Sequence, residues 1–459
     1  MKTRVEEDPL GRRRIPSEAY YGVQTLRAAE NFPVSGLKAH PALIWAYACL
    51  KKACAMANLE SGALEPKLAR ALLQACDEAR QGRFDRHFIV DVYQAGAGTS
   101  FNMNVNEVLA NRALELLGRR RGDYAVVHPN DHVNMAQSTN DTFPTAVYAA
   151  VLRQAALLSP ILESLAGAFR TQGRRWRKVV KSARTHLQDA VPITLGREFD
   201  AYAAAILAAR RQLERRTRLL RSVPLGGTVA GTGVNACRGF RGKAVRHLAR
   251  ESALPLKPAG DMRLLLQSHQ PLTAVSSALK ELALELIRIA NDLRLLSSGP
   301  MTGLAEIELP AVQPGSSFLP GKVNPSLLEC LDMVCFQIVG RDVAVSLAAQ
   351  AGQLDLNVMT PLSAYNLLDS LQMLINYLPV VESRCIRGIR ADRARCRDYA
   401  RKSLALAALL SPRLGYAAAA KIVQEARRRK VPAEQVVMER GCLKPGELDK
   451  LLDPSRWES

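Results

Sequence analysis

The amino-acid sequence predicts an all-α protein built around a bundle of long helices. It is visibly rich in Ala, Leu and Arg, and only 5% of its residues are aromatic. Unbranched side chains lose little rotamer freedom in a helix, so this composition favours helices over strands. Apolar residues also recur at helical spacing over long stretches, and four or more such helices predict a bundle. These stretches are residues 145–178, 197–222, 272–298 and 326–352.

The clearest of these patterns lies between residues 272 and 298. Its apolar residues alternate at spacings of four and three, which gives a period of about 3.5 residues, typical of a helix packed lengthwise against other helices. Gly299-Pro300 ends the pattern, because a helix cannot continue there. The spacing leaves open whether the neighbouring helices belong to the same chain. The residues of this seam are Val275, Leu279, Leu282, Leu286, Ile289, Leu293 and Leu296.

The length and the local patterns predict three domains. A chain of 459 residues exceeds the roughly 250–300 residues at which a single core stops growing. The first forty residues read as an extended segment, two short helices follow at 41–60 and 66–81, and residues 84–144 are rich in loops. Shorter helices and basic loops resume after about residue 395. We therefore expect an N-terminal domain at 1–138, a central bundle at 139–395 and a small C-terminal helical domain at 396–459.

The net charge of +20 raises the question of nucleic-acid binding. Runs such as Arg119-Arg120-Arg121 contribute to it, but no recognition motif with interleaved aromatic residues accompanies them. We therefore expect no nucleic-acid partner. The alternative is an inactive helical protein that binds nucleic acid or serves as a scaffold, and the basic excess is its sole support. An Arg-rich surface also attracts small dianions.

Cysteine spacing and hydropathy predict a cytoplasmic protein. The nine cysteines form no Cys-x-x-Cys pair, and several stand among apolar residues, where a free thiol packs as a small hydrophobe. The N-terminal residues lack the apolar stretch of a signal peptide, and no window offers the ~20 uninterrupted apolar residues of a membrane helix. The sequence also lacks the paired-Cys spacing that marks metal sites, a P-loop and a dinucleotide fingerprint, so we expect no metal and no cofactor.

The segment GSSFLPGKVNP, residues 315–325, combines features of an anion-binding loop. Gly315 and Gly321 permit unusual backbone angles, and Pro325 suits the first position of a helix. A helix N-terminus presents free N–H groups, and Lys322 adds a full positive charge, so a carboxylate is the natural ligand. The simpler alternative is an ordinary junction between a loop and a helix.

Three further polar segments are candidates for ligand binding. Ser138-Thr139-Asn140-Asp141 precedes a helical stretch, where capping alone would explain one or two of them. The polar residues from Thr99 to Asn104 follow a glycine-rich turn, and they either bind a ligand or tie down the loop. Thr185-His186 lies in RTHLQDAVP, although a lone histidine is more often structural than catalytic.

The order of these segments resembles the aspartase/fumarase superfamily over nearly the whole chain. GSSFLPGKVNP is similar to the superfamily signature, in which a serine pair precedes Pro, Lys, Asn and Pro. Before it come, in the family's order, EEDPLG, AYYGVQT, GAGTSFNMNVNE, HPNDHVN, QSTND, RTHLQDAVP, LGGTVAGTGVNA and LSSGP. One departure is Phe318-Leu319, where the family commonly has a Met before the Pro. It affects loop packing and touches no expected catalytic group.

The resemblance implies a three-domain helical lyase that assembles into a homotetramer. Long helices of four subunits would form a central bundle, and the seam at 275–296 would face partner subunits. Each active site would combine segments from three chains, which would explain why the polar segments are scattered. The substrate would be a small dicarboxylate, and neither a cofactor nor a membrane would be involved.

The resemblance also implies roles for individual residues. Ser316 would be the general base that removes a proton from the carbon beside one carboxylate. Glu329 would orient His186. The carboxylate that gains charge would be held by Ser317, Thr99, Ser138 and Thr139, the other carboxylate by Lys322 and Asn324, and the amino group by Asn140, Thr185 and His186.

Two reactions within the family remain open. Fumarases usually show GSGTQSNMN, whereas this chain has Gly96-Ala97-Gly98-Thr99-Ser100, and the segment Ala351-Gly352-Gln353-Leu354 also resembles aspartases. LGGTVAGTG and HPND with TFPTA are closer to fumarases. On balance the resemblance favours the reversible deamination of L-aspartate to fumarate and ammonia through an aci-carboxylate intermediate. The alternative is a class II fumarase, which hydrates fumarate to malate.

Overall fold

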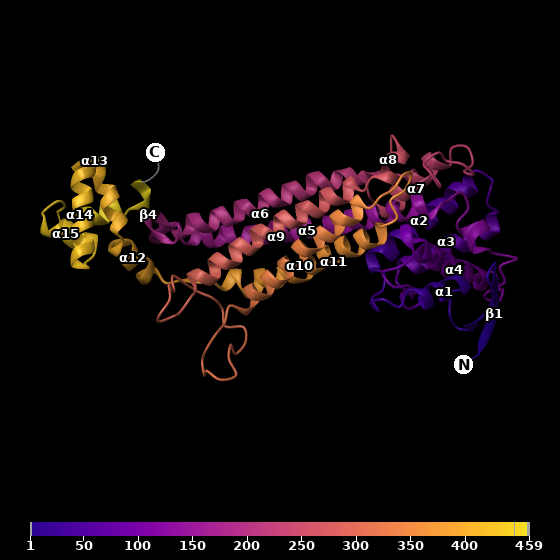
Figure 1. The fold of residues 1–459 in the computed structure, drawn as a ribbon, viewed down its shortest axis with the longest axis horizontal. Coiled ribbons are helices and arrows are strands. Elements are labelled where there is room, and N and C mark those ends of the chain that lie inside the picture. Colours follow the sequence, from indigo (N-terminus) through magenta and orange to yellow (C-terminus); the bar gives the residue numbers. More distant parts are fainter. Residues whose placement is uncertain (1, 445, 457–459) are drawn as a thin grey trace. The chain divides into compact units, whose positions relative to one another are not determined.

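The computed structural model describes residues 2–444 and 446–456, and most of them lie in helices (Figure 1). The prediction of an all-α fold with long bundled helices is confirmed, with one long helix, α11, beyond the four predicted stretches. The five longest helices are α5 (Thr139–Arg175), α6 (Leu195–Thr217), α9 (Gln270–Leu296), α10 (Ser326–Gln350) and α11 (Thr360–Arg384).

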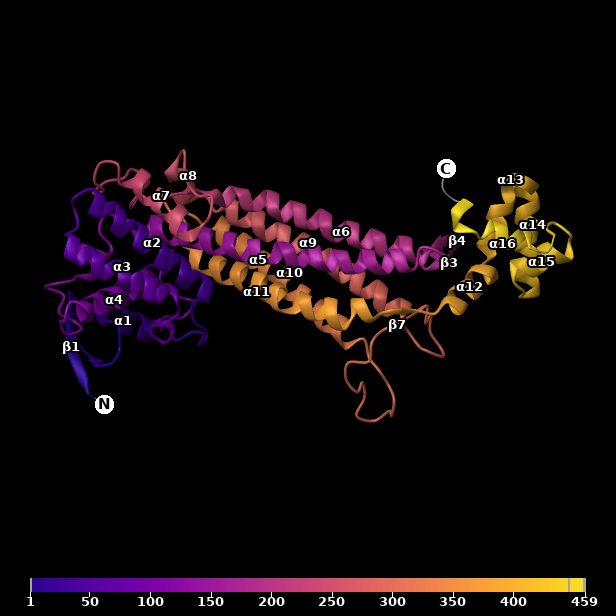
Figure 2. The ribbon, with the colours of Figure 1, turned by 180° about the vertical axis from the view of Figure 1, so that it is seen from behind.

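The chain forms two compact units, and each contains stretches of these long helices. Within each unit the helical stretches lie side by side (Figures 1 and 2). The three domains expected from the sequence stay a prediction. Unit 1 consists of Met1–Ser159, Arg211–Ala283 and Phe336–Ile375, and unit 2 of Pro160–Arg210, Leu284–Cys335 and Asn376–Ser459.

The apolar seam of α9 is buried within the single chain. Its seven residues, from Val275 to Leu296, are between 0% and 7% exposed. The expectation that this seam faces partner subunits is therefore wrong, because the chain's own residues already cover it. Exposed apolar side chains lie instead on α10, where Phe336, Val343 and Leu347 are 57%, 59% and 62% exposed.

Unit 1 contains the two short helices that the sequence predicts. They are α2 (Pro41–Glu60) and α3 (Pro66–Arg80), and each begins with a proline at a position whose N–H has no partner in a helix. Helix α2 packs against both α3 and α7. The remaining elements around them are α1 (Val23–Asn31), α7 (Phe240–Ser252), α8 (Met262–Gln267), the antiparallel strands β1 (Thr3–Asp8) and β2 (Gly11–Pro16), and the short parallel pair β5 (Ser222–Val223) and β6 (Lys257–Pro258).

The region predicted to be rich in loops, residues 84–144, contains a long helix, α4 (Thr99–Leu116). Its sequence shows little apolar periodicity because much of its buried surface is polar. Asn104 and Asn111 are completely buried, and their side-chain amides donate to the carbonyls of His87 and Tyr20 at 2.9 and 2.8 Å. Hydrogen bonds to neighbouring loops thus replace the apolar contacts that a sequence pattern would reveal.

Unit 2 joins a β-hairpin to the small C-terminal helices. Strands β3 (Val180–Thr185) and β4 (Gln188–Thr194) are antiparallel, and Val180 packs against the apolar core of the C-terminal helices. Those helices are α12 (Arg393–Lys402), α13 (Ser411–Leu414), α14 (Tyr416–Arg429), α15 (Ala433–Glu439) and α16 (Glu447–Leu451). A short antiparallel pair, β7 (Ile307–Glu308) with β8 (Arg390–Ala391), also belongs to this unit.

Among the described residues, α5 alone is long and apolar enough to cross a membrane, judged by length and composition. Two thirds (67%) of the residues in its apolar window are buried inside the protein, and the core helix of a folded protein passes the same test.

Gly98 determines how closely α4 approaches α5. It precedes α4 with a φ of 83°, and a Cβ atom there would lie 2.0 Å from Cδ2 of the buried Phe143. Gly98→Ala should therefore lower the thermal unfolding midpoint much more than Gly118→Ala. Gly118 has a similar φ of 71° and open space around it, so it reports the backbone cost alone, about 1–2 kcal/mol. Overpacking should add about 1–3 kcal/mol at Gly98. Equal shifts in the two variants would contradict the close contact.

Candidate active site

The first group of candidate residues lies at the N-termini of α4 and α5 in unit 1. Thr99 is the first residue of α4 and is exposed. Ser138 caps α5, because its Oγ accepts a hydrogen bond from the N–H of Asn140 at 3.2 Å. The contact of Gly98 with Phe143 places the two helix starts next to each other. Two adjacent N-termini with hydroxyl side chains favour an anion.

Asp141 fixes the start of α5 from inside. It is completely buried, and its carboxylate accepts hydrogen bonds from the N–H groups of Ser138, Gly226 and Thr228 at 2.9–3.0 Å. Burial raises the pKa of Asp141 to about 7, while these three donors and the nearby Lys51 act in the opposite direction. Gly226 and Thr228 belong to a loop that also contains Val229. The carbonyl of Val229 accepts a hydrogen bond from the Asn140 amide at 2.8 Å.

Lys51 is a supporting residue that the sequence interpretation missed. It is 1% exposed, and its Nζ donates to Oδ1 of Asn134 and Oε1 of Gln137, both at 2.9 Å. These two residues belong to the loop that leads into Ser138. Burial lowers the pKa of Lys51 to about 8. The sequence does hold a signal, since Lys51-Lys52 is the only charged pair between residues 42 and 59 of an otherwise apolar helix.

The second group is Thr185 and His186, at the turn between β3 and β4. Thr185 pairs with Gln188, so His186 and Leu187 are the two central residues of the turn, with φ angles of 55° and 58°. Turns of this kind usually contain Asn and Gly at these positions, because positive φ is unfavourable for other residues. The chain keeps a histidine and an exposed leucine there, and strained backbone of this kind concentrates at functional sites.

A buried ionic network holds the base of this hairpin. Lys181 pairs with Glu198 at 2.8 Å and with Glu306 at 2.9 Å, and Glu306 also pairs with Arg184 at 2.9 Å. The side chains of Lys181 and Glu306 are 2% and 0% exposed. Removing one member would leave a buried charge without its partner, which typically costs about 3–5 kcal/mol. The network therefore fixes the strand that leads to His186.

The third group is the loop of residues 315–325, in the connection that extends away from the ends of α9 and α10 (Figures 1 and 2). The N–H of Gly315 donates to the carbonyl of Lys322 at 2.8 Å, and the Asn324 amide donates to the carbonyl of Gly315 at 2.5 Å. A Cβ atom on residue 315 would lie 2.4 Å from that Lys322 oxygen, so the position requires glycine. These contacts close the loop into a ring directly before α10.

Ser316 has the hydrogen-bonding pattern that a basic oxygen needs. Its Oγ accepts from the N–H groups of Phe318 and Leu319 at 3.1 and 2.8 Å. Donors to an oxygen favour its charged form, so this arrangement lowers the free energy of an alkoxide relative to the hydroxyl. Ser317 and Lys322 are exposed on the same loop, and Glu329 lies in the first turn of α10.

The structure brings together the members of each group and leaves the second and third groups separate. Among residues 2–444 and 446–456, neither Thr185 nor His186 forms a hydrogen bond or an ion pair with residues 315–329. The predicted pair of His186 with Glu329 is thus not formed within one chain, and it stays a prediction.

Comparisons with known proteins identify the family of this chain. Residues 11–340 match a family model described as "Lyase", and residues 406–456 match "Fumarase C C-terminus". An aspartate ammonia-lyase of Bacillus subtilis is 44% identical, covering 98% of this chain and 95% of its own. A class II fumarate hydratase of Pseudomonas aeruginosa is 43% identical and covers 99% and 98%. The solved structure of a fumarate lyase:delta crystallin from Brucella melitensis is 47% identical, covers 99% of both chains and has a TM-score of 0.96. This chain therefore belongs to the aspartase/fumarase superfamily of lyases.

Proposed function

We propose that this enzyme is an aspartate ammonia-lyase, which converts L-aspartate reversibly to fumarate and ammonia. Its likeness to aspartate ammonia-lyases over nearly the full chain supports the choice of substrate. The observation that carries the chemistry is the pair of backbone N–H groups that donate to Ser316 Oγ. We further propose that the enzyme works in the cytoplasm without a cofactor.

The first step takes a proton from the carbon beside one carboxylate of aspartate. Ser316 Oγ receives this proton as an alkoxide, and the electron pair of the broken C–H bond moves into the neighbouring carboxylate. The resulting aci-carboxylate carries one additional negative charge. The pair stored on the aci-carboxylate then returns to form the carbon–carbon double bond of fumarate, while the C–N bond on the next carbon breaks and its electron pair leaves with the nitrogen as ammonia.

The additional charge on the aci-carboxylate needs donors that are already in place. Thr99, Ser138, Thr139 and Ser317 supply them in this proposal, together with the N-termini of α4 and α5. Donors fixed before the reaction stabilise developing charge without reorganisation. The buried contacts of Asp141 support this role, because they hold the start of α5 in one position.

The remaining groups bind the parts of the substrate that keep their charge. Lys322 and Asn324 bind the second carboxylate, and the amide of Asn324 has to leave the Gly315 carbonyl to do so. Asn140, Thr185 and His186 surround the amino group. Asn140 donates its amide N–H to Val229, which leaves its side-chain oxygen to accept from an ammonium group. Glu329 orients His186.

The three groups meet in this proposal when chains assemble into a homotetramer. Phe336, Gly340, Val343 and Leu347 follow one another on α10 at spacings of four, three and four, and the three apolar side chains are more than half exposed. That spacing suits a helix packed against another helix, and exposed apolar stripes of this kind indicate an interface. Residues from different subunits would then complete each site.

The substrate is tested by following fumarate absorbance with L-aspartate and with L-malate under the same conditions. We expect fumarate from aspartate at least about a hundredfold faster than from malate, because a site built to bind an ammonium group rejects an analogue that lacks it. The class II fumarate hydratase relative and the fumarase-like segment LGGTVAGTG support the second candidate, a class II fumarase. Turnover of malate alone would establish that candidate and refute ours.

Ser316→Ala tests the base. The variant should lose at least about a hundredfold in kcat, the range that general acid–base catalysis contributes, because it removes the oxygen to which the two backbone N–H groups donate. Ser383→Ala, a change of an exposed serine on α11, should keep its turnover. Fumarate should still raise the thermal midpoint of Ser316→Ala, which separates loss of chemistry from loss of binding. A Ser316→Ala enzyme with nearly native kcat would exclude the serine as the base.

A further inference from the structure

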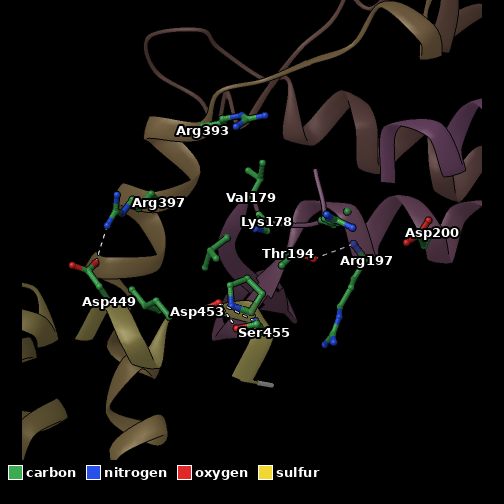
Figure 3. Close-up of a pocket in the computed structure, with 15 residues that line it drawn as sticks. Lys178, Val179, Thr194, Arg197, Asp200, Arg393, Arg397, Asp449, Asp453 and Ser455 are labelled. Carbon is green, nitrogen blue, oxygen red and sulfur yellow. Dashed lines mark hydrogen bonds and ion pairs between the residues drawn. The ribbon is translucent and has the colours of Figure 1, made fainter. Parts of the chain in front are cut away.

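A cavity of about 800 Å³ lies in unit 2. It is bounded by the base of the β3–β4 hairpin, the start of α6, one side of α12 and the last described residues of the chain (Figure 3). None of the residues assigned to catalysis or substrate binding lines it. Its volume is in the range of pockets for whole cofactors or metabolites, and a four-carbon dicarboxylate would fill only a small part.

One wall of this cavity is a rigid turn that displays two cations. The turn of residues 176–179 is anchored by Trp176, which is 1% exposed and packs edge-on against Phe199 with ring centroids 4.7 Å apart. The N–H of Gly196 donates to the Trp176 carbonyl at 3.2 Å. A Cβ atom on Gly196 would lie 2.8 Å from the nitrogen of Arg177, so this glycine permits the close approach. These contacts hold the backbone of the turn from which the side chains of Arg177 and Lys178 extend.

The opposite wall is the first part of α12. Arg393 and Arg397 are four residues apart, so they lie on the same face of the helix, and both line the cavity (Figure 3). Asp392 caps the helix by accepting from the N–H of Arg395 at 2.9 Å. Helix α12 therefore contributes two arginines to the lining, and the turn contributes Arg177 and Lys178.

Positive charge exceeds negative charge in the cavity. Its lining contains five basic residues and three carboxylates. The carboxylate of Asp449 is already compensated, because it pairs with Arg397 at 2.7 Å and also with Arg401. Within the described part of the chain, Arg177, Lys178 and Arg393 have no hydrogen bond or ion pair from their side chains. Three cations without partners around one cavity make the local potential positive, which attracts an anion.

We propose that this cavity binds an anion with two or more linked phosphate groups, of up to nucleotide size. Four of its five cations are arginines, whose planar guanidinium groups bind phosphate oxygens through paired hydrogen bonds. The two hydroxyl groups of the lining are already engaged. Thr194 accepts from the N–H of Arg197 at 3.3 Å, and Ser455 donates to the carboxylate of Asp453 at 2.8 Å. The arginines and Lys178 therefore supply the recognition.

Titration calorimetry of the full-length protein at physiological salt tests this site, with inorganic tripolyphosphate and ATP as probes. The triple variant Arg177→Gln, Lys178→Gln, Arg393→Gln should bind tripolyphosphate at least about tenfold more weakly than the native protein, because it loses three charge-assisted contacts. A matched control changes two arginines and one lysine on α14, as Lys421→Gln, Arg427→Gln, Arg428→Gln. It should bind within about twofold of the native protein, because these exposed residues lie outside the cavity and act through screened, long-range attraction alone.

Three results would overturn the proposal. The first is that tripolyphosphate does not bind the native protein. The second is that it binds the cavity triple variant as tightly as the native protein. The third is that binding weakens equally in both triple variants, which would indicate general attraction to a basic surface. Tighter binding of ATP than of tripolyphosphate would support the site and identify a nucleotide, and equal binding would support it and identify the phosphate chain alone. The three side chains are exposed and form no hydrogen bond or ion pair within the described residues, and Arg177→Gln alone should give a smaller loss in the same direction.

Discussion

The carboxylate of Asp141 accepts three backbone N–H groups in the interior of unit 1, and these bonds fix the first turn of α5. Two of the donors come from a loop more than 80 residues away in sequence. Asp141 therefore fixes Ser138 and Asn140 at the start of the helix. It also fixes the loop whose Val229 carbonyl accepts a hydrogen bond from the Asn140 amide. Lys51 likewise holds Asn134 and Gln137, in the loop that precedes Ser138. Buried polar groups that are fully hydrogen-bonded specify one geometry, because any alternative would leave a charge or a donor without a partner.

The same principle applies to the hairpin of unit 2. Lys181, Arg184 and Glu306 form a buried ionic network at its base, while the turn itself holds His186 in an unfavourable backbone conformation. A strained turn persists where the surrounding structure determines it, and the network provides that support. In the proposed mechanism this arrangement presents an imidazole from a rigid base, while the serine loop is closed by backbone contacts that can open.

Much of the fold could be predicted from the sequence, because long helices with a 3.5-residue seam, such as α9, leave a plain periodic pattern. Helix α4 could not, since buried asparagines that bond to loops interrupt its apolar surface. The prediction that the α9 seam faces partner subunits was also wrong. Periodicity shows that a helix face is covered, but it does not show by what, and the α9 seam is covered by its own chain. The candidate residues were found through motifs, whereas Lys51 acts through contacts that no motif records.

In the proposed mechanism, residues of different chains complete each active site. The most direct measurement mixes two inactive variants, Ser316→Ala and His186→Asn, by unfolding and refolding them together, and then records aspartate turnover. If one chain contributes the serine and another the histidine, equal mixing should restore about a quarter of the native activity, because both native residues meet in one site of four. A mixture that stays as inactive as either variant alone would contradict the account.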